Sequence, residues 1–165
     1  MKILGIDPGY ERLGIAIIEK APEKNNNKET LLFSECFKTH KDTPFVDRLA
    51  EIGNEIESVI KKHKPEYLAI ENLFFNTNQK TAMRVAEVRG TLLYIAKKAG
   101  LEIYEYTPLQ IKSAVAGNGR GSKKDVINML HKLISVDKKI QHDDEYDAIA
   151  VAITCFACNP QLMHS

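Results

Sequence analysis

The sequence predicts an α/β fold in which a five-stranded mixed sheet, three antiparallel strands followed by two parallel strands, is flanked by helices. Two observations lead to this fold class. Residues 2–38 contain three short apolar runs joined by turn-forming residues, which is typical of strands paired as an antiparallel meander. After residue 43, apolar positions at helical spacing alternate with two further short apolar runs, and helical crossovers of this kind make the later strands parallel.

The predicted strands are short and apolar. They are Lys2–Asp7, Leu13–Ile18, Leu31–Lys38, Tyr67–Glu71 and Ile103–Tyr106. The turn residues Pro8 and Gly9 close the first strand. The polar run Glu23–Lys28 is expected at the tip of a hairpin between the second and third strands.

The helices are predicted from their start signals and their apolar spacing. Thr43 suits an N-cap and Pro44 the first turn of a helix that carries apolar residues from Phe45 to Ile60. Further helices are expected at Gln79–Ala99, from Thr107–Pro108 to Gly117, from the N-cap Ser122 through Leu133, and from Asp144 to about Cys158. This order of elements is the one expected of a ribonuclease-H-like fold.

The composition is that of one globular domain spanning residues 1–165, with 44% hydrophobic and 27% charged residues. No apolar run approaches the roughly 18 residues that cross a bilayer. The first residues are predicted to be a strand, so we expect no signal peptide and a cytoplasmic protein. The three cysteines do not suggest a disulfide framework, and Cys155 and Cys158 lack the partners of a zinc site.

The net charge is only +1, from 23 basic and 22 acidic residues. Nucleic-acid-binding proteins are usually basic overall. If this chain binds DNA, its positive charge must therefore be concentrated on one face.

Acidic residues end two apolar strands and begin an apolar helix, where charge adds little stability. Asp7 ends the first strand and Glu71 the fourth. Asp144 and Asp147 are three residues apart and therefore on one helix face. If the first and fourth strands are neighbours, Asp7 and Glu71 lie at one end of the sheet, and a helix packed there adds the other two acids. We predict that these four residues are both catalytic and metal-binding.

Four carboxylates gathered in one place raise each other's pKa unless a cation neutralises them. Hard divalent ions such as Mg²⁺ bind oxygen ligands of this kind. Two such ions about 3.5–4 Å apart can activate an attacking water and stabilise a leaving oxygen. The chemistry that this predicts is phosphodiester hydrolysis.

Each acid also has an ordinary structural interpretation. Asp7 suits a turn before Pro8, and Glu71 could be a surface residue at a strand end. Asp144 is expected to serve as an N-cap whatever else it does, and Asp147 suits the helix dipole. Only the four together are specific.

The ligand register around the last two acids stays open. Asp143 and Glu145 are alternative ligands, while Asp147 is the firmest anchor because Ala148 and further apolar residues follow it. His142 could assist as a base or a polar contact, or be a solvated loop histidine.

Aromatic and cationic residues lie close to these acids in sequence. Phe74 and Phe75 follow Glu71 in a polar loop, where they would stack on bases or fold back into the core. The glycine-rich stretch 117–124 leads into a helix N-terminus, where amide groups and cations attract phosphate. Its basic residues are Arg120, Lys123 and Lys124, and Lys80, Arg84 and Arg89 could extend the positive surface along a helix.

These segments together resemble the RuvC family of Holliday junction resolvases, through nearly the whole chain. The matching stretches are Ile3–Gly9, Ala69–Glu71, Ala86–Gly90, Gln110–Lys112 with Gly117, and Asp144–Ala152. The first stretch alone is also similar to the phosphate loops of sugar kinases and Hsp70-like ATPases. The full set in this order is specific.

The resemblance implies a ribonuclease-H-like fold, a homodimer, two Mg²⁺ ions per active site (with Mn²⁺ able to substitute) and paired symmetric nicks across a four-way DNA junction. It also implies branch-migration proteins as partners. By position, the catalytic carboxylates are Asp7, Glu71, Asp144 and Asp147, although a histidine stands in other members where Asp144 stands here. Phe74 matches an aromatic that stacks on bases near the junction centre, and Lys112 and Lys123 match lysines that engage the DNA backbone.

The predicted function is therefore that of a Holliday junction endodeoxyribonuclease in recombination and DNA repair. Alternatives are another ribonuclease-H-like nuclease or a non-catalytic junction-binding protein. An ATP-binding module of the actin and Hsp70 type would need two such lobes, and 165 residues supply one.

Overall fold

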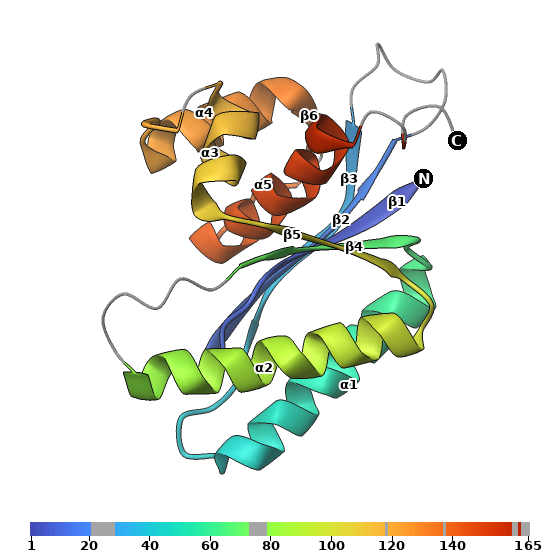
Figure 1. Ribbon diagram of the computed structural model, residues 1–165, viewed down its shortest axis with the longest axis vertical. Helices are drawn as coiled ribbons and strands as arrows, with labels where there is room; N and C mark the ends of the chain where they lie inside the picture. Colours follow the sequence, from blue (N-terminus) through green and yellow to red (C-terminus); the bar gives the residue numbers. More distant parts are fainter. Residues whose placement is uncertain (21–28, 73–78, 118, 137, 160–161, 163–165) are drawn as a thin grey trace.

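The computed structural model describes residues 1–20, 29–72, 79–117, 119–136, 138–159 and 162. In this part of the chain, six strands form one sheet with helices on both faces (Figure 1). The strands are β1 (Lys2–Asp7), β2 (Arg12–Glu19), β3 (Glu29–Lys38), β4 (Tyr67–Glu71), β5 (Glu102–Tyr106) and β6 (Ile134–Ser135). The helices are α1 (Phe45–His63), α2 (Gln79–Lys98), α3 (Pro108–Ala116), α4 (Lys123–Leu133) and α5 (Asp143–Cys158).

The sheet has the strand order β5-β4-β1-β2-β3-β6. β1, β2 and β3 are antiparallel neighbours, whereas β4 pairs parallel with β1, and β5 parallel with β4. This confirms the predicted mixed sheet, except that five strands were expected and the described residues contain six. The additional strand, β6, pairs parallel with Glu29 and Thr30 of β3 and is too short to show any periodicity in the sequence. The predicted tip at 23–28 lies outside the described residues.

Helices α1 and α2 cover one face of the sheet, and α5 covers the other, with α3 and α4 packed against it (Figure 1). The predicted N-caps of α3 and α4 are confirmed, because Thr107 and Ser122 each accept a bond from the amide three residues later in a reciprocal capping box. Gly117 closes α3 in the left-handed conformation that suits glycine. None of the described helices is both long and apolar enough to cross a bilayer.

The start of α1 differs from the prediction by one residue. Pro44, rather than Thr43, occupies the N-cap, and no side chain caps this helix. Pro44 has an extended ψ of 140°, so the helix begins at Phe45. The Pro44 carbonyl accepts the first helical bonds, from the amides of Asp47 and Arg48.

Strand periodicity divides the core into two layers. Along β1, Ile3 packs with α5 on one face, whereas Leu4 and Ile6 pack with α1 and α2 on the other. Along β4, Ala69 belongs to the α5 face and Leu68 to the opposite face. This alternation decides which side chains at the strand ends can reach α5.

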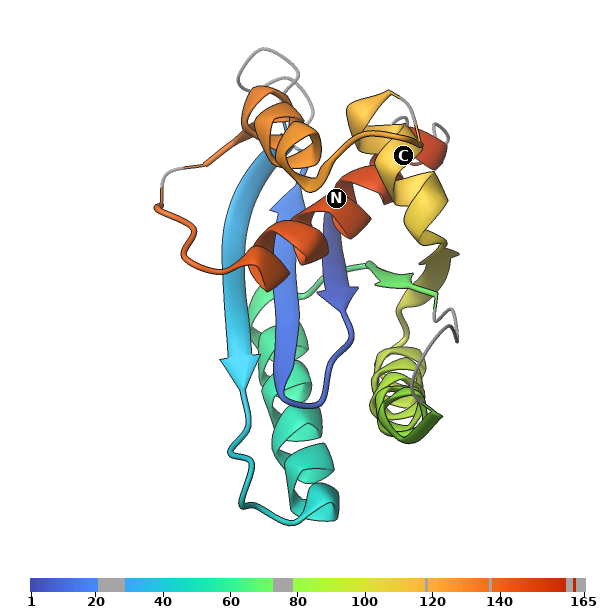
Figure 2. The ribbon, with the colours of Figure 1, turned by 90° about the vertical axis from the view of Figure 1, so that its left-hand side faces the viewer.

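Helix α5 lies directly across β1 and β2 (Figure 2). Glycines on both strands permit this close approach. A Cβ at Gly5 would lie 2.2 Å from the carbonyl oxygen of Ala148, and a Cβ at Gly14 would lie 2.1 Å from the carbonyl oxygen of Asp144. Only a strand position without a side chain allows the helix backbone to approach this closely.

Candidate active site

Asp7 and Glu71 end adjacent parallel strands on the same face of the sheet. β1 and β4 pair with Ile6 opposite Ile70, so that Asp7 and Glu71 occupy the next position on each strand. The alternation along both strands places these two acids on the face covered by α5. The prediction that the first and fourth strands are neighbours is therefore confirmed.

Helix α5 brings the other two predicted acids to the same place. Its first turn contacts β2 at Gly14, beside the Cβ of Asp7. The helix begins at Asp143 with His142 as an N-cap that makes no side-chain capping bond. The expectation that Asp144 caps this helix is thus wrong: Asp144 lies inside the first turn, and its carboxylate bonds elsewhere.

The electrostatics show that the four acids are close enough to act on one another. Burial, followed by the charges of Asp147, Glu71 and Asp144, raises the pKa of Asp7 from 3.8 to about 7. Burial and then Asp147 also raise the pKa of Glu71, which Lys112 partly offsets. Like charges therefore converge from β1, β4 and α5, and this cluster lacks enough positive charge to balance it.

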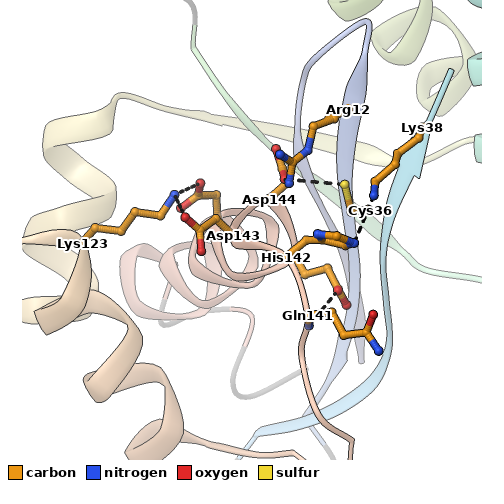
Figure 3. Close-up of polar contacts among 10 residues, drawn as sticks. Arg12, Cys36, Lys38, Lys123, Gln141, His142, Asp143 and Asp144 are labelled. Carbon is orange, nitrogen blue, oxygen red and sulfur yellow. Dashed lines mark hydrogen bonds and ion pairs between the residues drawn. The ribbon is translucent and has the colours of Figure 1, made fainter. Parts of the chain in front are cut away.

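Two cations of the chain pair with the α5 acids. Lys123, from the first residue of α4, places Nζ 2.8 Å from Asp147 and 3.4 Å from Asp143 (Figure 3). Arg12, from the first residue of β2, forms an ion pair with Asp144. Among the described residues, no three His, Cys, Asp or Glu side chains are already arranged to hold a metal ion. The Asp144 and Asp147 carboxylates instead pair with Arg12 and Lys123.

The structure also separates the alternative ligands around Asp144. Glu145 is only 4% exposed. It accepts hydrogen bonds of 2.7 Å from both Ser34 Oγ and Lys138 Nζ. Burial alone would raise the pKa of Glu145, but these bonds lower it below the ordinary value. Glu145 is thus an anchor of α5 and is committed to other partners.

Asp143 and His142 lie at the outer end of the site. The Asp143 side chain is 69% exposed, and its partner is Lys123. The Nε2 atom of His142 lies 3.2 Å from the Lys38 ammonium (Figure 3). The two α5 acids that act on Asp7 are therefore Asp144 and Asp147, as predicted.

A pocket of about 280 Å³ opens beside the acids, between α3, α4 and α5. Charged side chains and apolar side chains both line it. They are Glu71, Asp147, Lys112 and Lys123, with Pro108, Ile111, Val126 and Ala150. An anionic group in this pocket would meet two ammonium groups and two carboxylates at once.

Comparison with known proteins places this site in a family. The family model described as "Crossover junction endodeoxyribonuclease RuvC" matches residues 3–155. The chain belongs to the RuvC family. A protein of that description from Desulfitobacterium hafniense (strain DSM 10664 / DCB-2) is 42% identical over 164 residues, which cover 99% of this chain and 96% of the relative. One from Pelotomaculum thermopropionicum is 40% identical over 153 residues, covering 93% and 91%.

Solved RuvC structures have the same fold. The structure of Thermus thermophilus RuvC has a TM-score of 0.87 at 30% identity, covering 99% of this chain and 97% of that one. The structure of T. thermophilus RuvC in complex with Holliday junction substrate has a TM-score of 0.87 at 31% identity, covering 98% and 96%. The predicted ribonuclease-H-like α/β class is thereby confirmed.

The residues predicted to contact DNA lie in different places relative to the acids. Phe74 and Phe75 lie outside the described residues. Lys112 and Lys123 line the pocket, whereas Arg120 and Lys124 are exposed at the turn before α4 and in its first turn. Thus two of the four described basic residues flank the acids and two extend outward from them.

The N-terminus of α4 already has an anionic partner in this RuvC-family chain. Asp125 accepts a 2.8 Å bond from the Ser122 amide and a 2.7 Å bond from the Ser122 hydroxyl. These bonds lower the pKa of Asp125. The Ser122 amide at this end is therefore already bonded to a carboxylate and is not free.

Arg89 does not extend a positive surface, as the sequence suggested it could. It forms an ion pair with Glu105 and donates to Asn72 Oδ1 at 3.1 Å and to the Glu71 carbonyl at 3.3 Å. Its guanidinium thus ties α2 to the ends of β4 and β5. Arg84 stacks over the Phe45 ring, 4.6 Å from its centroid.

The sequence-based prediction missed Arg12 and the anchor formed by Ser34 and Lys138. Arg12 begins a strand and belongs to no motif that the sequence displays. The anchor joins residues of β3 to the region before α5, about a hundred positions away. Phe33 and Phe37 pack on the face of α1 and α2, and the period-two spacing of a strand from these two residues is the signal that could have placed Ser34 on the α5 face.

Proposed function

We propose that this protein is a crossover junction endodeoxyribonuclease, which cuts four-way (Holliday) DNA junctions by paired symmetric nicks in recombination and DNA repair. Membership of the RuvC family supports the proposal, as does the likeness to T. thermophilus RuvC in complex with Holliday junction substrate. The observation that carries it is the convergence of three acids on buried Asp7: burial, followed by the charges of Asp147, Glu71 and Asp144, raises the pKa of Asp7 to about 7. Residues 1–165 would act as a single nuclease domain in the cytoplasm, where the DNA substrate is located.

The donor set fits divalent metal ions. Asp7, Glu71, Asp144 and Asp147 offer only hard oxygen ligands, as Mg²⁺ requires, and Mn²⁺ is expected to substitute. The raised pKa of Asp7 means that the cluster would gain from a cation. Two ions held here would activate a water and stabilise the leaving oxygen of the phosphodiester. Asp144 and Asp147 pair with Arg12 and Lys123, so a metal ion would share these carboxylates with the two cations or displace them.

The remaining side chains of the site would hold and orient the substrate. Lys112 and Lys123 face the pocket from α3 and α4, where their ammonium groups would bind phosphate oxygens. The apolar side chains of Ile111 and Val126 line the same pocket and would exclude water from one side of the bound strand. Arg120 and Lys124 would contact the backbone further along the DNA.

The family also motivates the proposed assembly. A homodimer would present two such sites to the two strands that are cut symmetrically. Phe74 and Phe75 follow β4 directly and would stack on bases near the centre of the junction, at about 1–3 kcal/mol per base. Proteins that drive branch migration are the expected partners.

Incubation with labelled DNA tests this function. The substrates are a synthetic four-way junction and a linear duplex of the same sequence, each with and without added Mg²⁺. We expect paired nicks only in the junction and only with metal. The Asp7→Asn variant is expected to bind the junction but not to cut it, because binding rests on cations.

Each other outcome points to a different protein. Cutting of the linear duplex by the native chain would indicate a ribonuclease-H-like nuclease with another substrate. Binding of the junction with no cutting under any metal would indicate a non-catalytic junction-binding protein. Nicking by the Asp7→Asn variant at the native rate would remove Asp7 from the catalytic site.

A further inference from the structure

The carboxylate of Asp144 is held by side chains from two strands. The guanidinium of Arg12 on β2 bonds Oδ2 of Asp144, and Cys36 Sγ on β3 lies 3.5 Å from the same oxygen (Figure 3). Asp144 also contributes to the raised pKa of Asp7. It therefore lies between a fixed cation of the chain and the proposed metal site.

The backbone of Asp144 is held in place and does not bring the carboxylate closer to either Arg12 or the proposed metal site. Its carbonyl oxygen is pressed against Gly14, where even a Cβ would lie 2.1 Å away. The next residue, Glu145, is buried and bonded to Ser34 and Lys138. Because the Asp144 carbonyl and the residue that follows it are held in place, side-chain rotation is the simplest way to take the carboxylate from one partner to another.

A second cation next to Arg12 favours its ion pair with the Asp144 carboxylate. In the β2–β3 ladder it stands directly opposite Lys38. Like charges in such cross-strand pairs repel each other. The Arg12 side chain meets the Asp144 carboxylate, whereas Lys38 contacts His142. Asp144 is thus the anion that balances Arg12 at this end of the sheet.

We propose that Arg12 is a positioning residue that competes with the divalent cation for the Asp144 carboxylate and so weakens metal binding in the absence of DNA. The proposal rests on the proposed function, because it assumes that Asp144 is a metal ligand. A guanidinium and a divalent ion that share one carboxylate repel each other, so each weakens the binding of the other. Arg12 thereby sets how readily the site takes up metal.

Equilibrium binding of Mn²⁺ to the full chain without DNA tests the proposal, with titration calorimetry at about 0.15 M salt, where the Debye length is about 8 Å. Arg12→Gln is expected to bind Mn²⁺ about two- to fivefold more tightly than the native chain, as expected from the modest strength of exposed ion pairs. Lys38→Gln is the matched control, since it removes the same charge from the facing strand position without touching Asp144. Its affinity is expected to stay native.

A double-mutant cycle identifies the carboxylate through which Arg12 acts. In an Asp144→Asn background, Arg12→Gln is expected to leave Mn²⁺ affinity unchanged. The proposal would be overturned if Arg12→Gln raised Mn²⁺ affinity as much in the Asp144→Asn background as in the native chain. It would also be overturned if Lys38→Gln raised Mn²⁺ affinity as much as Arg12→Gln does. In either case the effect would come from the loss of a positive charge and not from competition for Asp144. Far-UV circular dichroism melts verify that each variant is folded, as expected for the half-exposed Arg12.

The same titration separates this inference from the proposed function. If Asp7→Asn binds Mn²⁺ as tightly as the native chain, the proposed metal site fails and the role of Arg12 fails with it. If the native chain binds Mn²⁺ through Asp7 and Arg12→Gln binds no more tightly, the role of Arg12 alone is refuted.

Discussion

Replacing Asp7 by asparagine in metal-free protein measures the cost of an ionised carboxylate that is buried next to three other acids. The pKa of Asp7 is raised from 3.8 to about 7, first by burial and then by Asp147, Glu71 and Asp144. An acid whose pKa rises on folding binds its proton more tightly in the folded state, so its ionisation opposes folding. Protonated Asp7 therefore favours the folded state. This contribution to the free energy of unfolding is fully present below pH 3.8 and is lost as the pH rises through about 7.

The size of the effect follows from the shift. One pKa unit corresponds to about 1.4 kcal/mol, so ionised Asp7 lowers the free energy of unfolding by about 4 kcal/mol above pH 7. At pH 5 the unfolded chain is ionised and the folded chain is protonated, and the loss is about 1.5 kcal/mol. Asparagine does not titrate. The stability advantage of Asp7→Asn should therefore grow by about 2–3 kcal/mol between pH 5 and pH 8.

Urea denaturation in the presence of EDTA provides the measurement, followed by far-UV circular dichroism because the chain has no Trp. Asp47→Asn, at an exposed position in the first turn of α1, controls for the loss of one surface charge. An Asp7→Asn advantage that stays constant between pH 5 and pH 8 would refute the reasoning. So would a variant that is less stable than the native chain throughout that range.

Two further substitutions test how α5 is held. Gly14→Ala would place a Cβ 2.1 Å from the Asp144 carbonyl oxygen, so we expect a loss of about 1–3 kcal/mol in thermal unfolding together with weaker Mn²⁺ binding. A native melting temperature would contradict this packing. Ser34→Ala removes one bond to buried Glu145 and is expected to cost about 1.5–3 kcal/mol in urea unfolding, because the bond is to a charged group. An unchanged urea midpoint would mean that the Ser34 bond adds nothing to stability.

The acids at the strand ends were predictable because their signal is local. Asp7 and Glu71 each follow an apolar run, and a parallel pairing of the two runs was enough to bring them together. Asp147 was predictable for a similar reason, since three residues separate it from Asp144 on the same helix. The capping role expected for Asp144 was wrong, because the helix starts one residue earlier and its carboxylate is taken by Arg12.

The partners of these acids were not predictable, because they depend on packing between distant segments. Arg12 meets Asp144 only because α5 lies across β2, and no local pattern gives the position at which a helix crosses a strand. Glu145 resembled a possible ligand in the sequence. Its commitment to Ser34 and Lys138 depends on the register of β3 beneath α5.

Gly5 on β1 limits which substitutions can alter the spacing of the acids. A Cβ at Gly5 would lie 2.2 Å from the Ala148 carbonyl and 2.8 Å from the Ala152 Cβ, so strand and helix are in contact backbone to backbone. The acid-bearing surfaces therefore behave as one rigid frame, with no side-chain layer between them to absorb a shift. Lys112 and Lys123 stand on separate helices outside this frame. Under the proposed function, we expect substitutions in α3 and α4 to change which DNA is preferred while the backbone spacing of the acids on β1 and α5 stays constant.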